Sequence, residues 1–433
     1  MSIGAADGSL AHGDWNWAFG RKVGDWTLAL VVFLGAFVIA EPAPYELFLS
    51  PVLVIWAVFG FRLNRYLLPL IVLLAIYIAG GFLALTQKAE PVSQLLYVVV
   101  TFFLALSAIF FAAIISEAPE RRLRIIRRAY IASAFVAALL AVLGYFHLIP
   151  GSDAFLLYDR AKGPFQDPNV FAPYLVLPIV LLYRDILTEP LHRSWWKAAI
   201  LLLLLLGIFL AFSRAAWGMT VFAGLMITVV SYITSSRGTP RLRIVSLFAA
   251  GVFVVALMVM VALTVPDINQ LFVDRGTTLL EDYDAGPYGR FGRHLQGLYL
   301  IVQHPLGLGP FSFAYLLGGD EHNMWIKGFT TYGWIGGFAY IALAIWTLVA
   351  ATPLIFKPRP WQAIIQCTYV VFVGHLLIHN VIDNDHWRHV FLIYGMLWGG
   401  IAAEKLAVRS ERLRATTLVP AAHGRLPEMS RPA

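Results

Sequence analysis

Apolar runs of about 20 residues recur along the whole chain and determine what it can fold into. Of the 433 residues, 59% are hydrophobic and only 13% are charged. In a bilayer such a run forms a transmembrane helix, because every backbone polar group must be satisfied within the segment. The sequence therefore predicts an all-α polytopic membrane protein rather than two or three soluble domains.

The runs predict about twelve transmembrane helices, with both termini on one side of the membrane. They cover residues 25–40, 46–60, 66–86, 94–116, 129–148, 169–187, 196–212, 215–234, 243–265, 333–356, 361–381 and 388–404. The chain then divides into an N-terminal segment 1–24, nine helices within 25–265, one long loop over 266–332, three helices within 333–404 and a tail over 405–433. We expect the tail to be disordered, because Pro, Arg and Ala dominate it.

Lys and Arg are divided unequally between the two sets of alternate loops. Of the 32 basic residues, 23 fall on the side of the termini and 9 on the other side. Because cytoplasmic loops carry the excess of Lys and Arg, this predicts cytoplasmic termini and a periplasmic long loop. The net charge of +7 is explained first by this topology, and no nucleic-acid partner is expected. The first apolar run follows a long, weakly basic segment, which argues against a cleaved signal peptide.

Several of the outer basic residues lie at predicted turns or breaks. Arg160 and Lys162 begin "RAKGPFQDPN", whose Gly and Pro residues predict a turn and whose Asn169 can cap the next helix. A turn alone and a turn with an anion site both remain open here. Arg214 lies in "FSRAAW", where the run 198–234 must break because it is too long for one crossing. Arg214 can extend to lipid headgroups or bind phosphate oxygens in a bidentate way.

The predicted long loop contains the other candidate site residues. Arg290 and Arg293 lie within it, and "GGDEHN" near its end contains His322 and Asn323. His322 is suited to proton transfer near neutral pH, and the Asp and Glu directly before it can orient it. A lone His is more often a satisfied hydrogen-bonding group. The acidic neighbours, and the Gly-rich stretch that lets the backbone approach a ligand, favour a site here.

Two Asp-x-Asp pairs on the outer side leave a metal-dependent site open. Asp282 and Asp284 form "DYD", and Asp383 and Asp385 form "DND", the spacing found in glycosyltransferases that use a divalent cation. The alternative is that these are solvated loop acids that pair with nearby cations.

A few further residues argue against other kinds of site. His375 and His379 share one helix face, but no Glu accompanies them as in zinc proteases, so interior hydrogen bonding is favoured. Cys367 is the single cysteine, so no intrachain disulfide can form. No Lys follows a Gly, which excludes a Walker A motif.

Three segments in order resemble the O-antigen ligase and O-antigen polymerase superfamily: "RAKGPFQDPNVFA", "AFSRAAWG" and "GRFGRHLQGLYLIVQHPLGLGPFSF…HNMWIKGFTTYGWIGG". The ligase pattern His-Asn-Ser, eight residues, Gly-x-x-Gly is similar to His322, Asn323, Gly333 and Gly336, with Met324 in place of Ser. The resemblance covers about residues 155–400. It implies a bacterial inner-membrane enzyme of GT-C-like architecture with a periplasmic active site.

The resemblance also implies roles for single residues. Arg214 and Arg290 would bind the diphosphate of a polyprenyl-diphosphate-linked glycan, and His322 would be the catalytic base. The expected further substrate contacts are Arg160, Lys162, Asn169, Arg293 and Asn323. No metal or other cofactor is expected, because a lipid diphosphate is already a good leaving group. The acceptor would be a saccharide such as lipid A-core, in lipopolysaccharide or exopolysaccharide biosynthesis. A polymerase of the same superfamily remains an alternative, and so does a transporter or flippase.

Overall fold

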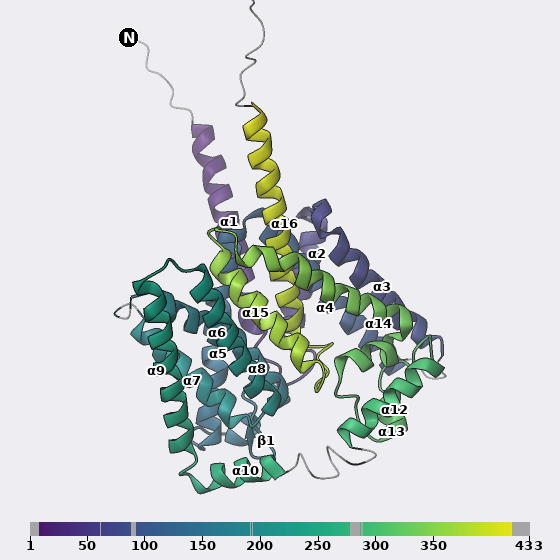
Figure 1. The fold of residues 1–433 in the computed structure, drawn as a ribbon. Coiled ribbons are helices and arrows are strands. Elements are labelled where there is room, and N and C mark those ends of the chain that lie inside the picture. The colour runs from purple at the N-terminus through teal and green to yellow at the C-terminus, as the bar shows by residue number, and fades with distance from the viewer. Residues whose placement is uncertain are drawn as a thin grey trace, which may run out of the picture.

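The computed structural model describes residues 8–60, 62–87, 92–190, 192, 194–277, 286 and 289–417. Most of this part is helical. A short antiparallel sheet pairs β1 (Leu156–Leu157) with β2 (Arg160–Ala161), with Leu157 opposite Arg160. The helices pack into one bundle from which α1 (Gly8–Leu34) and α16 (Arg388–Thr417) project at the same end (Figure 1). The predicted all-α class is confirmed for the described residues.

Eight helices in the described ranges are long and apolar enough to cross a membrane. They are α3 (Leu68–Leu85), α4 (Val92–Glu117), α5 (Pro119–Tyr145), α6 (Pro168–Thr188), α8 (Arg214–Thr234), α9 (Thr239–Ala262), α14 (Met324–Ala351) and α16. Shorter apolar helices are α2 (Pro44–Ile55), which continues as η1 (Trp56–Gly60), α7 (Trp195–Leu210) and α15 (Gln362–Ile378). A helix therefore lies at each predicted position, and the chain has the helix lengths of a multi-pass membrane protein.

The described parts of the segment 266–332, which are 266–277, 286 and 289–332, are mostly helical. They contain α10 (Pro266–Thr277), α12 (Arg290–Gln303) and α13 (Ser312–Leu317). The next helix, α14, begins at Met324 rather than at the predicted position 333. The reason is local: the side chain of Asn323 accepts a hydrogen bond from Ile326 N at 3.1 Å and so caps the helix nine residues earlier than expected.

One face of α12 is apolar and exposed. Its residues recur at the spacing of a single helix face, namely Phe291, Leu295, Leu298, Tyr299 and Val302, and all are at least 49% exposed. The opposite face packs on α14: a Cβ added at Gly297 would lie 2.7 Å from Ile326 Cγ2. This is the pattern of a helix that lies in a membrane interface.

Close helix pairs build the centre of the bundle. A Cβ added at Gly80 of α3 would lie 2.8 Å from Gly336 N of α14, so these two backbones are in direct contact. The same holds for α16 and α4, where a Cβ at Gly399 would lie 2.6 Å from Ile115 Cβ. Small residues allow such close approach. Membrane helices depend on this packing because, in lipid, the hydrophobic effect does not drive helices together.

Gly333 produces a kink inside α14. Its φ of 68° lies in the left-handed region, which few residues other than glycine adopt. The kink lets the "HPLGLG" stretch pack against the helix: Trp334 N donates to Pro305 O at 2.8 Å, and Leu308 N donates to Thr330 O at 2.6 Å. The left-handed φ of Gly333 thus serves a contact within the protein.

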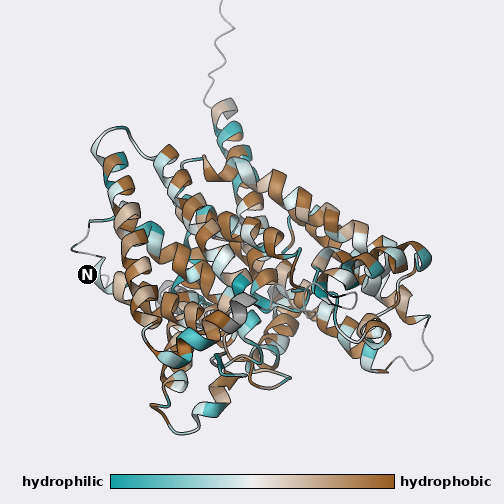
Figure 2. Ribbon diagram, turned by 60° about the horizontal axis from the view of Figure 1, so that its bottom comes forward, coloured by the Kyte–Doolittle hydropathy of each residue, from teal (hydrophilic) through white to brown (hydrophobic). Residues whose placement is uncertain are grey.

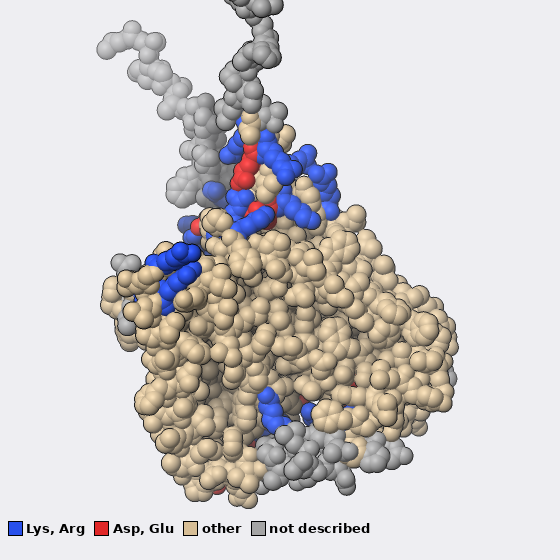
Figure 3. All heavy atoms as spheres, in the orientation of Figure 1, with Lys and Arg blue, Asp and Glu red and all other residues tan. Residues whose placement is uncertain are grey.

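Hydrophobic residues dominate the sides of the helices, and hydrophilic ones gather toward the ends and the central connections (Figure 2). In Figure 3, charged side chains cluster at the end from which α1 and α16 project. There α16 continues past its predicted end at 404 to Thr417, so residues 405–417 are helical and not a disordered tail. The helix formers of "SERLRA" and the ion pair between Arg359 and Glu411, 2.6 Å, account for the extension. Residues 418–433 lie outside the described ranges.

Candidate functional site

His322 lies in the short connection between α13 and α14, which hydrogen bonds fasten to the end of α15. Met324 N donates to His379 O at 2.8 Å, and Asn323 Nδ2 donates to Asn380 O at 3.2 Å. His322 itself has a positive φ of 47°, an unusual conformation for a residue other than glycine. Asn323 is therefore a capping and anchoring residue in this structure, and it holds His322 in place.

The side chain of His322 faces Asp383, in the connection between α15 and α16. Nδ1 of His322 lies 3.6 Å from Asp383 Oδ1, and the two side chains are 28% and 15% exposed. This distance exceeds that of a direct hydrogen bond but suits an ion pair once the imidazole is protonated. With Nδ1 turned toward the carboxylate, Nε2 is the ring nitrogen on the side away from Asp383.

Asp383 also binds a buried cation, Lys327 of α14. Lys327 Nζ lies 2.6 Å from Asp383 Oδ2 and 3.6 Å from Asp385 Oδ1. Burial alone would raise the pKa of Asp383, but the charge of Lys327 and the contact with His322 outweigh it and hold that pKa well below its ordinary value. The carboxylate is therefore ionised at neutral pH.

Asp385 is buried deeper, beneath this pair. Its Oδ2 accepts hydrogen bonds from Tyr97 Oη at 2.6 Å and Tyr332 Oη at 3.2 Å. The interpretation of "DND" as solvated acids is therefore wrong, because both carboxylates are largely removed from solvent. The expected pairing with a nearby cation is confirmed, and the cation is Lys327.

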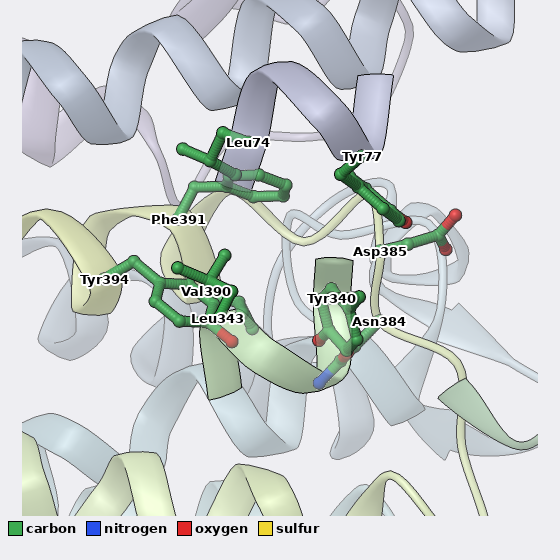
Figure 4. A pocket seen from close by; sticks show the side chains of 9 residues that line it. All are labelled: Leu74, Tyr77, Tyr340, Leu343, Asn384, Asp385, Val390, Phe391 and Tyr394. Atoms are coloured by element: carbon green, nitrogen blue, oxygen red, sulfur yellow. The ribbon is translucent and has the colours of Figure 1, made fainter. Parts of the chain in front are cut away.

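A small cavity of about 10 Å³ lies under Asp385, between Tyr77, Tyr340 and Asn384. Figure 4 shows Asp385 at one edge of it and Leu74, Phe391 and Tyr394 on the other side. A volume of this size holds about one water molecule. A sugar or a lipid diphosphate cannot enter a space of this size.

The acidic neighbours of His322 do not orient it, contrary to the sequence-based interpretation. Glu321 is buried and accepts a hydrogen bond from Thr330 Oγ1 at 2.7 Å. Burial is the main reason why the pKa of Glu321 is raised. Asp320 is exposed. The orienting carboxylate is Asp383, which is distant in sequence and was assigned to a possible metal site.

The first turn of α12 contains two of the predicted arginines and lies beside the segment that precedes His322. Arg293 is buried against Gly319, where an added Cβ would overlap its guanidinium. His294, the next residue, lies close to the backbone of the segment 321–322. Burial lowers the pKa of His294 and outweighs its contacts with the backbone of residues 321–322, which act in the opposite direction. The structure therefore places Arg293 against the segment before His322, with Arg290 at the start of the same helix.

Arg160 and Asn169 lie at a second place, around the break between α7 and α8. Arg160 Nε donates to Ala211 O at 2.8 Å, and its Nη2 donates to Asn169 Oδ1 at 2.9 Å. Asn169 does not cap α6 as expected: Asp167 does, accepting from Asn169 N at 2.6 Å. These contacts favour the structural interpretation of Arg160 and Asn169. Lys162 is half-buried in the same turn, where its backbone N–H donates to Phe155 O.

Arg214 is the first residue of α8, so the predicted break of the long apolar run is confirmed. α8 packs along α15, where a Cβ added at Gly374 would lie 3.0 Å from Met219 Cγ. Arg214 lies five residues before Met219, and His379 lies five residues after Gly374. Because α8 and α15 run in opposite directions, Arg214 and His379 lie at the same end of this helix pair. At the same end, His379 O accepts the hydrogen bond from Met324 N, and Met324 is two residues after His322. Figure 3 shows basic side chains in a hollow on the side of the molecule opposite the termini.

The structure gives little support to the other candidate metal sites. No group of three or more His, Cys, Asp or Glu side chains among the described residues is arranged to hold a metal ion. Asp282 and Asp284 lie outside the described residues. His375 is buried, and neither of its ring nitrogens has a hydrogen-bond partner within the described ranges, so the expected interior hydrogen bond is not seen there. Its ring lies 5.2 Å from that of His389, between centroids.

Compared with known proteins, the sequence matches no protein-family model and no curated protein. The resemblance of the three motifs to the O-antigen ligase and polymerase superfamily therefore stays a prediction.

Proposed function

We propose that the protein is an O-antigen ligase-like membrane glycosyltransferase that moves a glycan from a polyprenyl diphosphate to a saccharide acceptor on the periplasmic face. The observation that carries the proposal is the pairing of His322 with Asp383, next to the helix α12 that contains Arg290 and Arg293. A base with an orienting carboxylate, next to cations, is what this transfer requires.

In the proposed reaction an acceptor hydroxyl oxygen attacks the anomeric carbon of the donor sugar. The bond between that carbon and the diphosphate oxygen breaks, and the lipid diphosphate leaves with its electron pair. Nε2 of His322 takes the hydroxyl proton, and the resulting imidazolium is stabilised by Asp383 at 3.6 Å. Arg290 and Arg214 offset the charge that develops on the leaving diphosphate.

The surroundings of the site support a substrate held at the membrane surface. The exposed apolar face of α12 fits the interface, and the same helix carries Arg290 and Arg293. A lipid-linked diphosphate lies at that level, with its chain in the bilayer. We further propose twelve membrane crossings in the bacterial inner membrane, with both termini cytoplasmic, which is the side of the charged cluster in Figure 3.

Lys327 supports transfer without a metal ion. Its ammonium group contacts both Asp383 and Asp385, so the two carboxylates that could ligate a divalent cation already have a positive partner. Two arginines then supply the charge that a metal would bring to the diphosphate. The choice between ligase and polymerase depends on the acceptor: a lipid A-core saccharide for the first and a growing glycan for the second.

The direct experiment uses purified protein in liposomes that contain a polyprenyl-diphosphate-linked glycan and a saccharide acceptor. We expect glycan transfer that continues in EDTA. Transfer that stops in EDTA and returns with magnesium or manganese would contradict the arginine mechanism. Asp282, Asp284, Asp383 and Asp385 would then become the first residues to mutate.

Transport is a second candidate function, favoured by His375. Its ring is buried in α15, and its nitrogens lack partners among the described residues, as in ion paths of membrane transporters. Substrate flux into liposomes without glycan transfer, abolished by His375→Leu, would favour transport. Transfer that persists in this variant would favour the enzyme.

A further inference from the structure

A basic cavity lies at the end of the molecule from which α16 projects, far along the chain from the candidate site. Its volume is about 440 Å³, and its lining includes Tyr66 of the short 3₁₀ turn η2 (Arg65–Leu67). The charged lining residues are Arg65, Lys357, Lys405, Arg409, Arg412 and Glu404. Binding sites for small molecules have volumes of about 300–1,000 Å³, so the cavity is large enough for a ligand.

The lining keeps a surplus of positive charge whatever its internal pairing, because it holds five cations and one carboxylate. Glu404 is already shared, at 3.1 Å from Lys357 Nζ and 2.8 Å from Arg359 Nε. Tyr66 lies between two other cations, with its ring centroid 5.1 Å from Arg65 Cζ and 5.6 Å from Lys405 Nζ. Such a cavity favours an anion, and several cations around one space suit a phosphate.

We propose that this cavity binds the phosphate headgroup of an anionic phospholipid in the leaflet on the side of the termini. Apolar surface begins directly beside it: Leu63 and Leu68 flank η2 and are 38% and 57% exposed. Leu68 is the first residue of α3, a candidate membrane span, so an acyl chain can follow that helix away from the cavity. A soluble phosphate would leave this apolar surface unused. The proposal is independent of the glycan transfer proposed above.

The test measures lipid binding to the purified full-length protein in detergent by native mass spectrometry. The probes are short-chain phosphatidylglycerol, phosphatidylcholine with the same chains, and inorganic phosphate as a soluble competitor. We expect phosphatidylglycerol to bind in preference to phosphatidylcholine. Lys405→Gln and Arg409→Gln should each weaken its binding about fivefold, because a cation near a lipid surface contributes roughly this factor.

The matched control is Arg237→Gln, which removes one positive charge from the exposed connection between α8 and α9, outside the cavity lining. It should leave lipid binding unchanged. Equal binding of the two lipids, or an equal loss of binding in the control, would overturn the proposal. Competition by inorganic phosphate at the affinity of phosphatidylglycerol would overturn the assignment to a lipid. Thermal unfolding without lipid checks that the cavity variants fold like the parent protein.

Discussion

Lys327 Nζ lies 2.6 Å from Asp383 Oδ2, although the two residues are 56 positions apart in the chain. The other oxygen of the same carboxylate lies 3.6 Å from His322 Nδ1. One Asp therefore joins a buried cation to the residue proposed as the base. Its ionisation therefore bears on the stability of the N-terminal end of α14 and on the role proposed for His322.

Asp383→Asn should destabilise the protein by about 3 kcal/mol, the low end for breaking a buried pair, because Asp385 remains beside Lys327. The loss should depend on pH. The pKa of Asp383 is depressed in the folded protein, so the ion pair contributes fully above the unfolded pKa of about 4; its contribution declines as pH falls below that value and is lost only as pH falls through the depressed folded pKa. Thermal unfolding at pH 7 and at about pH 3 measures this.

A difference between Asp383→Asn and the parent protein that is equal at both pH values would contradict that account of the pair. Asp320→Asn is the matched control, because Asp320 is exposed two residues before His322. It should change neither stability nor transfer.

Glu321→Gln should have the opposite effect and raise the unfolding temperature at pH 7. Burial raises the pKa of Glu321, so its favourable neutral form is lost as pH rises through the folded value. Gln cannot ionise and keeps an oxygen that accepts the hydrogen bond from Thr330 Oγ1. Unfolding scans at pH 5 and pH 8 should show a gain that grows with pH. A variant less stable than the parent at pH 8 would show that Glu321 is needed in its charged form.

Gly333→Ala should cost about 1–3 kcal/mol or more of stability, because its φ of 68° strains any residue with a Cβ. The added Cβ would also lie 2.7 Å from the carbonyl carbon of Leu306. Gly328→Ala in the same helix is the control, since its Cβ would meet its nearest atom at 3.7 Å. Equal unfolding temperatures for the two variants would mean that the kink at Gly333 is not required.

Arg214→Ala should abolish transfer, and Arg214→Lys should restore little of it, because a point charge cannot reproduce bidentate contact with phosphate. The transfer rate at matched membrane levels is the measurement. Arg237→Ala, an exposed arginine in the connection at the other end of α8, should remain active. Full activity in both Arg214 variants would instead indicate that Arg214 extends to lipid headgroups.

The sequence was sufficient to predict the helices and the break at Arg214. Apolar runs report burial in a bilayer directly, and a run too long for one crossing must be interrupted. It also placed Arg290, Arg293 and His322 in one segment, which the structure folds into α12 and the connection before α14.

The partners of these residues could not be predicted. Asp383 and Lys327 meet only because the start of α14 is hydrogen-bonded to the end of α15 through Met324 N and His379 O. No local sequence pattern predicts that contact. Periodicity likewise cannot show that Gly333 adopts a positive φ inside a continuous helix. Local patterns predict elements, whereas the pairing of side chains depends on how the elements pack.

The most direct measurement is the single-turnover rate of glycan transfer by His322→Ala, with donor binding measured on the same preparation. We expect the rate to fall by about 10²–10⁴-fold, as for loss of a general base, while binding of the lipid-linked donor is retained. His304→Ala, an exposed histidine at the end of α12, is the control and should transfer at the parent rate. A His322→Ala protein that transfers glycan at the rate of the parent would contradict the proposed mechanism.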